Sequence, residues 1–253
     1  MLNVSAGKVA IVAGGGGIGG ATARKLAAAG TAVVIGDLDE GNAKAIADDI
    51  IGEGGQARSI RCDISDEVSV AAMVRLAVDA FGGLDFAHVN AADLSVIFRD
   101  SNVLDVGLDV FDRTIAVNLR GHLLCTRAVL PELLKRGAGA IVYTTSGAAF
   151  AGEPERPCYA IAKSGLHALM RHVASRWGRK GIRANCVAPG FVMTENNKKT
   201  MPPDLLDHMR AATRSTRVGD PEDIAAMVAL LLSDEGAWIN GQVISVDGGA
   251  TMR

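Results

Sequence analysis

Short apolar segments alternate with longer amphipathic segments along the whole chain. Several of the short segments are apolar at every position, which is typical of parallel strands in a sheet with both faces covered. The longer segments repeat apolar positions at helical spacing. We expect strands over 8–13, 32–36, 56–61, 84–89, 139–145, 182–187 and 242–246. We expect helices over 22–29, 42–52, 67–81, 110–136, 159–179 and 221–232.

This alternation predicts an α/β fold of the Rossmann-like type. Strand–helix–strand units with right-handed connections give a doubly wound parallel sheet of about seven strands, with helices on both faces. The 253 residues fit one domain spanning 1–253. The segments 93–107 and 195–217 interrupt the rhythm. Because long connections in compact domains are usually functional, we expect 195–217 to be a substrate lid. Its apolar members are Met201, Leu205, Leu206 and Met209.

Composition excludes several classes of protein. The net charge of −2 gives no field that would attract nucleic acid or an anionic membrane, and only 4% of residues are aromatic. No apolar run approaches the ~20 residues of a membrane helix, and the N-terminus lacks signal-peptide features, so we expect a cytoplasmic protein. The four cysteines are widely spaced and are expected to be free, buried thiols, and the histidines show no metal-ligand spacing.

A glycine-rich segment, GGGGIGG at 14–20, lies between the first predicted strand and the first predicted helix. Gly14, Gly16 and Gly19 satisfy the G-x-G-x-x-G pattern, which lets the backbone approach a pyrophosphate at a helix N-terminus. Asp37 ends the second strand, where a carboxylate accepts hydrogen bonds from the adenosine ribose of NAD. Its neighbour is Leu38 rather than a basic residue, which favours NAD over NADP. The alternatives are a plain glycine-rich turn and a surface aspartate.

Three polar residues form a candidate catalytic group. Tyr159 and Lys163 are four residues apart, so they share one face of a predicted helix. A phenol has a pKa of about 10, and a nearby ammonium lowers it, so the pair makes a usable general acid/base. Ser146 follows a predicted strand, at the edge of the sheet where ligands bind. Taken alone, each of these residues has an ordinary structural explanation.

Taken together, these segments resemble the short-chain dehydrogenase/reductase family over essentially the whole chain. The matching positions, in the order of the family's motifs, are 14–19, Asp37, 62–64, 89–92, Asn118, Ser146, Tyr159, Lys163, 189–190, Thr194 and 246–249. The chain departs from the family at three places. The glycine loop is one residue shorter, with Ala13 in place of threonine. Val89 and Ala92 replace an asparagine and a glycine, and the connection 93–107 is longer.

The resemblance implies a role for each matching residue. Tyr159 would be the acid/base, Ser146 would orient the substrate oxygen, and Lys163 would bind the nicotinamide ribose and lower the pKa of the tyrosine. Asn118 would bend its helix and hold a water in a proton relay. The implied cofactor contacts are Gly14, Gly16, Gly17, Ile18, Gly19, Asp37, Leu38, Asp63, Ile64, Asn90, Ala91, Tyr159, Lys163, Pro189, Val192 and Thr194.

The predicted function is hydride transfer between NAD(H) and a secondary alcohol or ketone, a small-molecule substrate, without a metal. Two alternatives stay open: a catalytically inactive dinucleotide sensor of the same fold, and a lyase or epimerase. The presence of Asn118, Ser146, Tyr159 and Lys163 favours the enzyme. Arg156, at the predicted pocket rim, either selects an anionic substrate or pairs locally with Glu153; we favour the local pair.

We expect a homotetramer, with a dimer as the alternative. The resemblance implies it, and the long helices 110–136 and 159–179 carry more apolar residues than one sheet face needs. These residues are Leu123, Leu124, Val129, Leu166, Leu169 and Met170.

Overall fold

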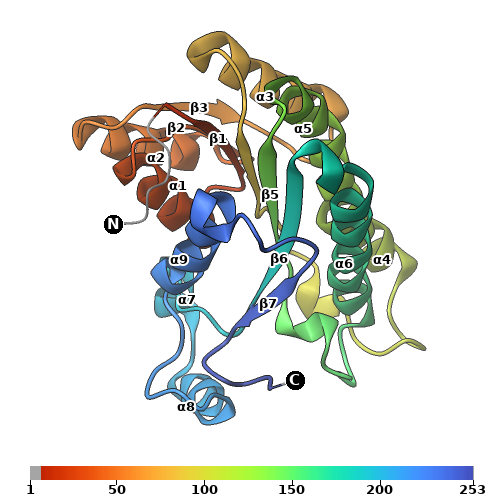
Figure 1. Ribbon diagram of the computed structural model, residues 1–253. Coiled ribbons are helices and arrows are strands. Elements are labelled where there is room, and N and C mark those ends of the chain that lie inside the picture. Colours follow the sequence, from red (N-terminus) through yellow and green to blue (C-terminus); the bar gives the residue numbers. More distant parts are fainter. Residues whose placement is uncertain (1–6, 253) are drawn as a thin grey trace.

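The structure, a computed structural model, describes residues 7–252. Within that range the chain forms a seven-stranded parallel sheet of order β3-β2-β1-β4-β5-β6-β7 (Figure 1). The strands are β1 (Val9–Ala13), β2 (Ala32–Asp37), β3 (Ala57–Arg61), β4 (Phe86–Val89), β5 (Gly139–Thr144), β6 (Ile182–Pro189) and β7 (Val243–Val246). The predicted fold class is confirmed.

Helices cover both faces of the sheet (Figure 1). They are α1 (Ile18–Ala28), α2 (Glu40–Gly52), α3 (Glu67–Phe81), α4 (Leu108–Ile115), α5 (His122–Arg136), α6 (Pro157–Trp177), α7 (Glu195–Thr200), α8 (Pro203–Ala212) and α9 (Pro221–Leu232). Helices α1, α2 and α9 pack on one face, and α3, α5 and α6 on the other.

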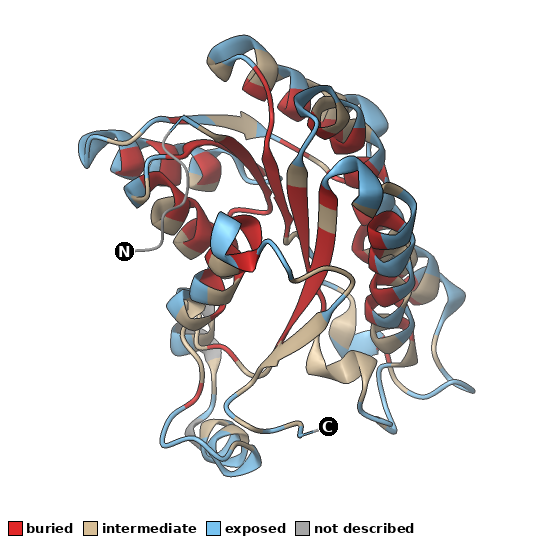
Figure 2. Ribbon diagram, in the orientation of Figure 1, coloured by how far each residue is buried: buried red, intermediate tan, exposed pale blue. Residues whose placement is uncertain are grey.

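Successive residues of the central strand β1 enter two different cores. Val9 and Ile11 belong to the core beneath α3, α5 and α6, whereas Ala10 and Val12 belong to the core beneath α1, α2 and α9. Side chains alternate across a strand, so a strand covered on both faces must be apolar throughout. Figure 2 shows the result, a band of buried strands between two half-buried helix layers.

The order of the strands creates a crevice. The chain extends the sheet from β1 to β2 and β3, and then returns to place β4 on the other side of β1. Connections that leave β1 and β4 therefore diverge at their carboxyl ends, and ligands of doubly wound proteins bind at such a point.

Helix α1 begins at Ile18, four residues before the predicted start at Thr22. Glycine disfavours helix, so the sequence pattern placed the glycines in the loop. The fold needs them in the first turn instead: a Cβ at Gly19 would lie 1.8 Å from the carbonyl oxygen of Gly14. Only glycine allows the helix N-terminus to approach the end of β1 so closely.

The predicted helix over 110–136 is helical throughout, but it is not α-helical throughout. Helix α4 ends at Ile115, a π-helical stretch spans Ala116–Gly121, and α5 follows. Asn118 lies inside the π-helical stretch, which agrees with the bend implied by the family resemblance. A π-helical stretch of this kind frequently marks a functional site.

The segment 195–217 contains the short helices α7 and α8, which the sequence pattern did not place. Both follow β6 in the chain; in Figure 1, α7 lies next to α9 and α8 lies at the bottom of the view. The lid role of this segment stays a prediction.

Two expectations from composition concern the state of the cysteines and the presence of membrane-spanning helices. All four cysteines are buried and free, as expected. In the described part of the chain, no helix is long and apolar enough to cross a membrane.

Candidate active site

A cavity of about 660 Å³ lies in the crevice at the carboxyl ends of the strands. Of the predicted catalytic residues, it is lined by Ser146, Tyr159 and Lys163. Of the other predicted cofactor contacts, it is lined by Gly14, Gly16, Gly17, Ile18, Asp37, Leu38, Asp63, Ile64, Asn90, Ala91, Pro189, Val192 and Thr194. Gly19 and Asn118 are not part of the lining.

The glycine loop is held by backbone hydrogen bonds to the neighbouring strand. The Gly14 N–H donates to the carbonyl oxygen of Gly36 at 2.7 Å. Gly14, Gly16 and Gly17 face the cavity, whereas Gly19 packs behind Gly14. In this shortened loop, three of the predicted glycines therefore face the cavity, and their contact with a phosphate stays a prediction.

Asp37 does not present a free carboxylate to the cavity. Its Oδ2 accepts hydrogen bonds from the Gly15 N–H at 2.7 Å and from Asn42 Nδ2 at 3.1 Å. Its Oδ1 accepts one from the Asp39 N–H at 2.9 Å. A carboxylate has about four acceptor positions, so these three bonds hold the side chain in place and leave about one position for a further donor. Sequence analysis missed Gly15 and Asn42, because nothing in their spacing indicates a contact with Asp37.

The beginning of α6 places Tyr159 at the cavity. The N–H groups of Cys158 and Tyr159 donate to the carboxylate of Asp100, at 3.2 Å and 2.9 Å. Asp100 is buried in the long connection between β4 and α4. A carboxylate stabilises a helix N-terminus by pairing with N–H groups that have no partner within the helix. This connection therefore fixes the start of the helix that carries Tyr159 and Lys163.

Lys163 is buried and directed toward the end of β5. Its Nζ donates to the carbonyl oxygen of Thr144 at 3.0 Å and lies 5.8 Å from the centroid of the Tyr159 ring. Burial lowers the pKa of Lys163 from 10.5 to about 8, because the charged form is poorly solvated there. The lysine therefore loses its proton at a lower pH than an exposed lysine does.

Burial raises the pKa of Tyr159, and a hydrogen bond with Ser146 opposes this effect. Lys163 is not among the causes that set this pKa, so the lowering by the lysine that the resemblance implies stays a prediction. The ammonium lies over the Tyr159 ring and donates a hydrogen bond to the carbonyl oxygen of Thr144. Because its pKa is raised, Tyr159 is protonated at neutral pH, which is the form of a general acid.

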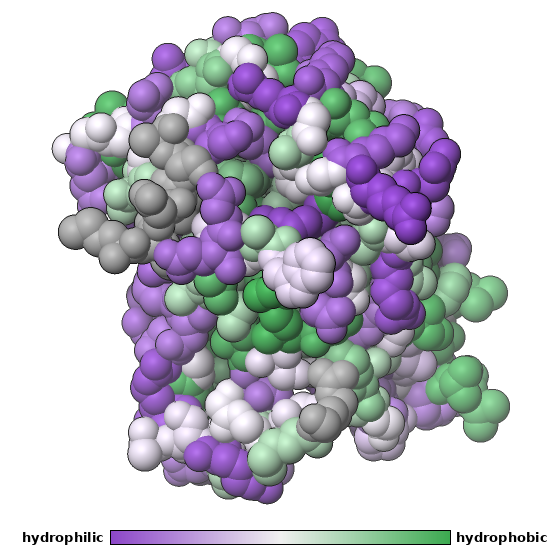
Figure 3. Space-filling model, in the orientation of Figure 1, coloured by the Kyte–Doolittle hydropathy of each residue, from purple (hydrophilic) through white to green (hydrophobic). Residues whose placement is uncertain are grey.

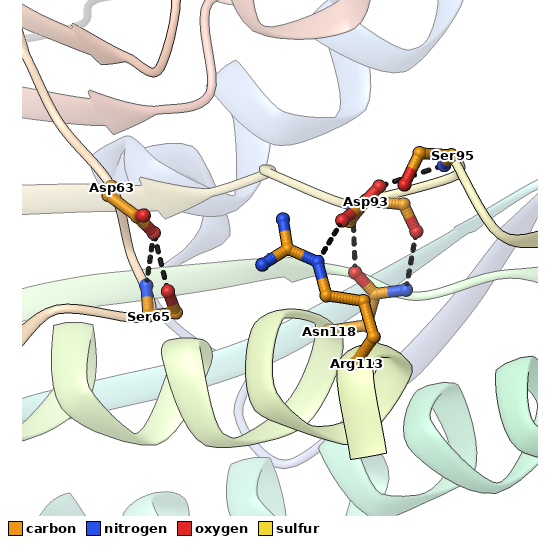
Figure 4. Close-up of polar contacts among 6 residues, drawn as sticks. All are labelled: Asp63, Ser65, Asp93, Ser95, Arg113 and Asn118. Atoms are coloured by element: carbon orange, nitrogen blue, oxygen red, sulfur yellow. Dashed lines mark hydrogen bonds and ion pairs between the residues drawn. The ribbon is translucent and has the colours of Figure 1, made fainter. Parts of the chain in front are cut away.

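Asn118 is buried, and its side chain makes two hydrogen bonds to the backbone of Asp93 (Figure 4). Its Oδ1 accepts from the Asp93 N–H at 2.7 Å, and its Nδ2 donates to the Asp93 carbonyl oxygen at 3.0 Å. Both ends of the amide are occupied by one peptide segment. The side chain thus fixes the loop after β4, and the water-holding role implied by the resemblance stays a prediction.

Arg113 is a charged residue of the cavity wall that sequence analysis missed. Its Nε donates to Asp93 at 2.5 Å, and its terminal nitrogens point toward the cleft between Asp63 and Asp93 (Figure 4). Burial acts to raise the pKa of Asp93, but hydrogen bonds from Ser95 and Arg113 outweigh it and hold the pKa below its usual range. A hydrogen bond from Ser65 lowers the pKa of Asp63. Both carboxylates are therefore ionised at this end of the cavity.

Thr194 and Arg156 were also singled out from the sequence, and only Thr194 lines the cavity. A Cβ added at Gly17 would meet Thr194 Cγ2 at 2.7 Å, so Thr194 packs directly on the glycine loop. Arg156 forms an ion pair with Glu153 at 2.5 Å, the local pair that we favoured. Among the described residues, no cluster of histidine, cysteine and acidic side chains is arranged to hold a metal ion.

Comparison with known proteins agrees with this geometry. Residues 12–251 match a family model described as enoyl-(acyl carrier protein) reductase. A probable short-chain type dehydrogenase/reductase of Bradyrhizobium diazoefficiens is 42% identical over 244 residues, covering 96% of this chain and 87% of that protein.

Two solved structures are similar over nearly their full length. A 7α-hydroxysteroid dehydrogenase complexed with NADH and 7-oxo glycochenodeoxycholic acid has a TM-score of 0.91 at 33% identity, covering 99% of this chain and 97% of that chain. A short chain dehydrogenase from Burkholderia cenocepacia in complex with NADP has a TM-score of 0.87 at 35% identity, covering 97% and 98%. With its parallel sheet, its glycine loop and these similarities, the chain belongs to the short-chain dehydrogenase/reductase family.

Proposed function

We propose that the protein is an NAD-dependent oxidoreductase that transfers hydride between NAD(H) and a secondary alcohol or ketone. The observation that carries the proposal is that Ser146, Tyr159 and Lys163 line the same cavity as the glycine loop and Asp37. A hydroxyl–tyrosine–lysine group next to a dinucleotide site can hold a substrate oxygen and exchange its proton. A purely sensory protein has no need of this arrangement.

The residues present fit a nicotinamide dinucleotide. Gly16 leaves open space, since a Cβ there would meet nothing within 4 Å, and the N-terminus of α1 favours a pyrophosphate. When bound, the nicotinamide ring supplies or accepts the hydride. The proposed contacts are Gly14, Gly16 and Gly17 with pyrophosphate, Asp37 with ribose, Asp63 and Ile64 with adenine, Asn90 and Ala91 along the cofactor, and Pro189, Val192 and Thr194 with the carboxamide.

The protein's own part in the reaction is to hold the substrate oxygen and move its proton. Ser146 donates a hydrogen bond to that oxygen and orients it. Tyr159, protonated at neutral pH, gives its phenolic proton to the oxygen of a ketone. In the reverse direction its phenolate form takes the proton from an alcohol. Lys163 provides a buried positive charge near the ring, which favours the phenolate that forms during the reaction.

A cofactor and substrate panel tests this proposal. Purified protein is mixed with NAD or NADP and with secondary alcohols of several classes, including a 7α-hydroxysteroid. Formation of NADH or NADPH is followed by absorbance. Turnover of at least one alcohol supports the enzyme. Tight binding of NADH without turnover of any alcohol or ketone would favour the inactive sensor instead.

We predict at least a tenfold preference for NAD over NADP in kcat/KM. A 2′-phosphate would bring negative charge against Asp37, whose carboxylate is fixed by Gly15 and Asn42. A hydrogen bond to a charged group contributes about 1.5–3 kcal/mol, which corresponds to tenfold or more. Asp37→Ala should weaken NAD binding and narrow the preference, whereas Asp48→Ala, on the exposed side of α2, should change neither. Equal efficiency of the wild-type protein with both cofactors contradicts the prediction.

We also propose a homotetramer, but most of the residues expected at its interface are not available for it. Leu124, Val129, Leu166 and Met170 are buried within the subunit and cannot contribute to an interface. The exposed apolar residues on this side include Leu123 and Ile161, which are 44% and 50% exposed. Hydrophobic side chains also project at the right-hand edge of Figure 3. Light scattering at micromolar concentration should give about four times the chain mass of 26.2 kDa, and a monomer alone contradicts the proposal.

A further inference from the structure

Two threonines stand at the carboxyl end of β5, Thr144 as its last residue and Thr145 directly after it. Each contacts a buried histidine. Thr144 Oγ1 lies 2.9 Å from Nε2 of His88 on β4. Thr145 Oγ1 lies 3.0 Å from Nε2 of His167 on α6. Thr145 Oγ1 also donates to the backbone carbonyl of Lys163, whereas Thr144 Oγ1 donates to Asn90 Oδ1 at 2.9 Å. The Thr144 side of this arrangement therefore leads toward the cofactor cleft.

From Asn90 the hydrogen bonds continue to the glycine loop. Asn90 Nδ2 donates to the carbonyl oxygen of Gly14 at 3.0 Å. On its other side, the Gly14 N–H donates to Gly36 at 2.7 Å. Gly14 is thus held from both sides, by strand β2 through its N–H and by Asn90 through its carbonyl. The path from His88 to the loop consists of three consecutive hydrogen bonds.

The direction of these bonds follows from the donors available. Because the Thr144 hydroxyl gives its proton to Asn90, it must accept from His88, so the imidazole carries its proton on Nε2. His88 Nδ1 is then a bare acceptor, and it has no hydrogen-bond partner in the described part of the chain. The other tautomer would leave a buried N–H unpaired, which is rarer in proteins than an unpaired acceptor. Every donor therefore points from His88 toward the loop.

We infer that His88 is a positioning residue for the cofactor-binding loop, acting through Thr144 and Asn90 on the carbonyl of Gly14. The inference rests on the proposed function in that the loop binds a nicotinamide dinucleotide. His88 is fully buried and is not part of the cavity lining, so it touches neither cofactor nor substrate. Thr144 also accepts the Lys163 Nζ hydrogen bond through its carbonyl, so one residue supports both the loop and the lysine.

The histidine performs this role as a neutral group. Burial lowers the pKa of His88 to about 3, far below the working pH of an enzyme. The donor arrangement is therefore the same at pH 6 and at pH 8. Loss of His88 should weaken cofactor binding by the same factor at both values.

Glutamine and asparagine variants test the inference with matched polarity. In His88→Gln the amide nitrogen can take the place of Nε2 and donate to Thr144, whereas in His88→Asn the shorter side chain cannot reach. His88→Leu removes the donor altogether. The loss of one buried hydrogen bond is worth about 1 kcal/mol, so the dissociation constant for NADH, measured by fluorescence, should rise about fivefold in His88→Asn and His88→Leu. It should stay within about twofold of wild type in His88→Gln.

A control on the same strand separates positioning from stability. Tyr143→Phe removes a buried hydrogen bond of 2.8 Å to Thr126. Among the described residues, the Tyr143 side chain makes no hydrogen bond to Asn90 or Gly14. It should lower the melting temperature without changing the dissociation constant for NADH. Hydrogen–deuterium exchange without cofactor should be faster in the peptide containing residues 13–20 for His88→Asn and His88→Leu, and unchanged for Tyr143→Phe.

Each outcome has a defined meaning. Wild-type loop exchange in both His88→Asn and His88→Leu overturns the inference, as does equal weakening of NADH binding in the glutamine and asparagine variants. If His88→Leu does not fold, the glutamine–asparagine comparison decides by itself. A wild-type protein that binds neither NADH nor NADPH overturns the proposed function instead, and the exchange measurement still decides whether His88 positions the loop.

Discussion

Replacing Tyr159 by phenylalanine is expected to reduce turnover by about 10²–10⁴-fold or more, with little change in NADH binding. Phenylalanine keeps the ring volume at the beginning of α6 and removes only the hydroxyl that exchanges a proton with the substrate. The N–H of residue 159 still pairs with Asp100, so the helix start is preserved. Steady-state kinetics with a productive alcohol and NADH fluorescence titration measure the two quantities separately.

The other tyrosine of the chain provides the matched control. Tyr143 is fully buried on β5 and its hydroxyl bonds to Thr126, away from the cavity. Tyr143→Phe makes the same chemical change and should retain most of the turnover. If the Tyr159→Phe enzyme kept half of its activity, the acid/base assignment would be wrong.

The fold was predictable because its main signals are local. A strand such as β1 is apolar at every position, since both of its faces are covered, and this pattern is visible without knowledge of the structure. The glycine loop between a strand and a helix is equally local. Helix boundaries were less predictable where tertiary contacts decide them. Gly19 lies in α1 against its helix propensity, because the helix must approach the carbonyl of Gly14.

The cavity wall was predictable at motif positions but not at positions set by long-range contacts. Asp100 holds the start of α6 from a connection that shows no pattern. Arg113 lies on α4 and reaches Asp93, which is distant in sequence. Such pairs are created by the way the chain folds back on itself.

The electrostatics of the site were the least predictable part. Sequence reasoning placed an ammonium near a phenol and expected the pKa of Tyr159 to be lowered. In the structure, desolvation is the first cause acting on both side chains. It raises the pKa of Tyr159 and lowers that of Lys163, because it disfavours the charged form of each. Burial of a side chain by the rest of the fold cannot be read from the spacing of two residues.

Desolvation of Lys163 implies that this lysine reduces the stability of the folded protein. A pKa lowered from 10.5 to about 8 means that the folded protein holds the ammonium less well than the unfolded chain does. At 1.36 kcal/mol per pH unit, the charged lysine costs on the order of 3 kcal/mol at pH 7. The lost hydrogen bond to Thr144 offsets about 1 kcal/mol of this when the lysine is removed.

Lys163→Met is therefore expected to raise the free energy of unfolding by about 2 kcal/mol at pH 7 while abolishing turnover. Below about pH 8 the lysine is protonated in both the folded and the unfolded wild type. The extra free energy of unfolding of the variant is therefore constant there. Between pH 8 and 10.5 the unfolded chain binds the extra proton, so this lysine's contribution to wild-type stability rises with pH and the advantage of the variant shrinks. Denaturant unfolding at pH 7 and pH 10 measures the difference.

Lys44→Met is the matched control, because Lys44 lies exposed on α2 and pairs only with Asp48 among the described residues. Exposed ion pairs contribute about 0–1 kcal/mol, so this variant should unfold with nearly wild-type free energy at both pH values. A Lys163→Met protein that is less stable than wild type at pH 7 would show that the ammonium is well paired rather than poorly solvated. A difference between Lys163→Met and wild type that did not shrink toward pH 10 would contradict the lowered pKa itself.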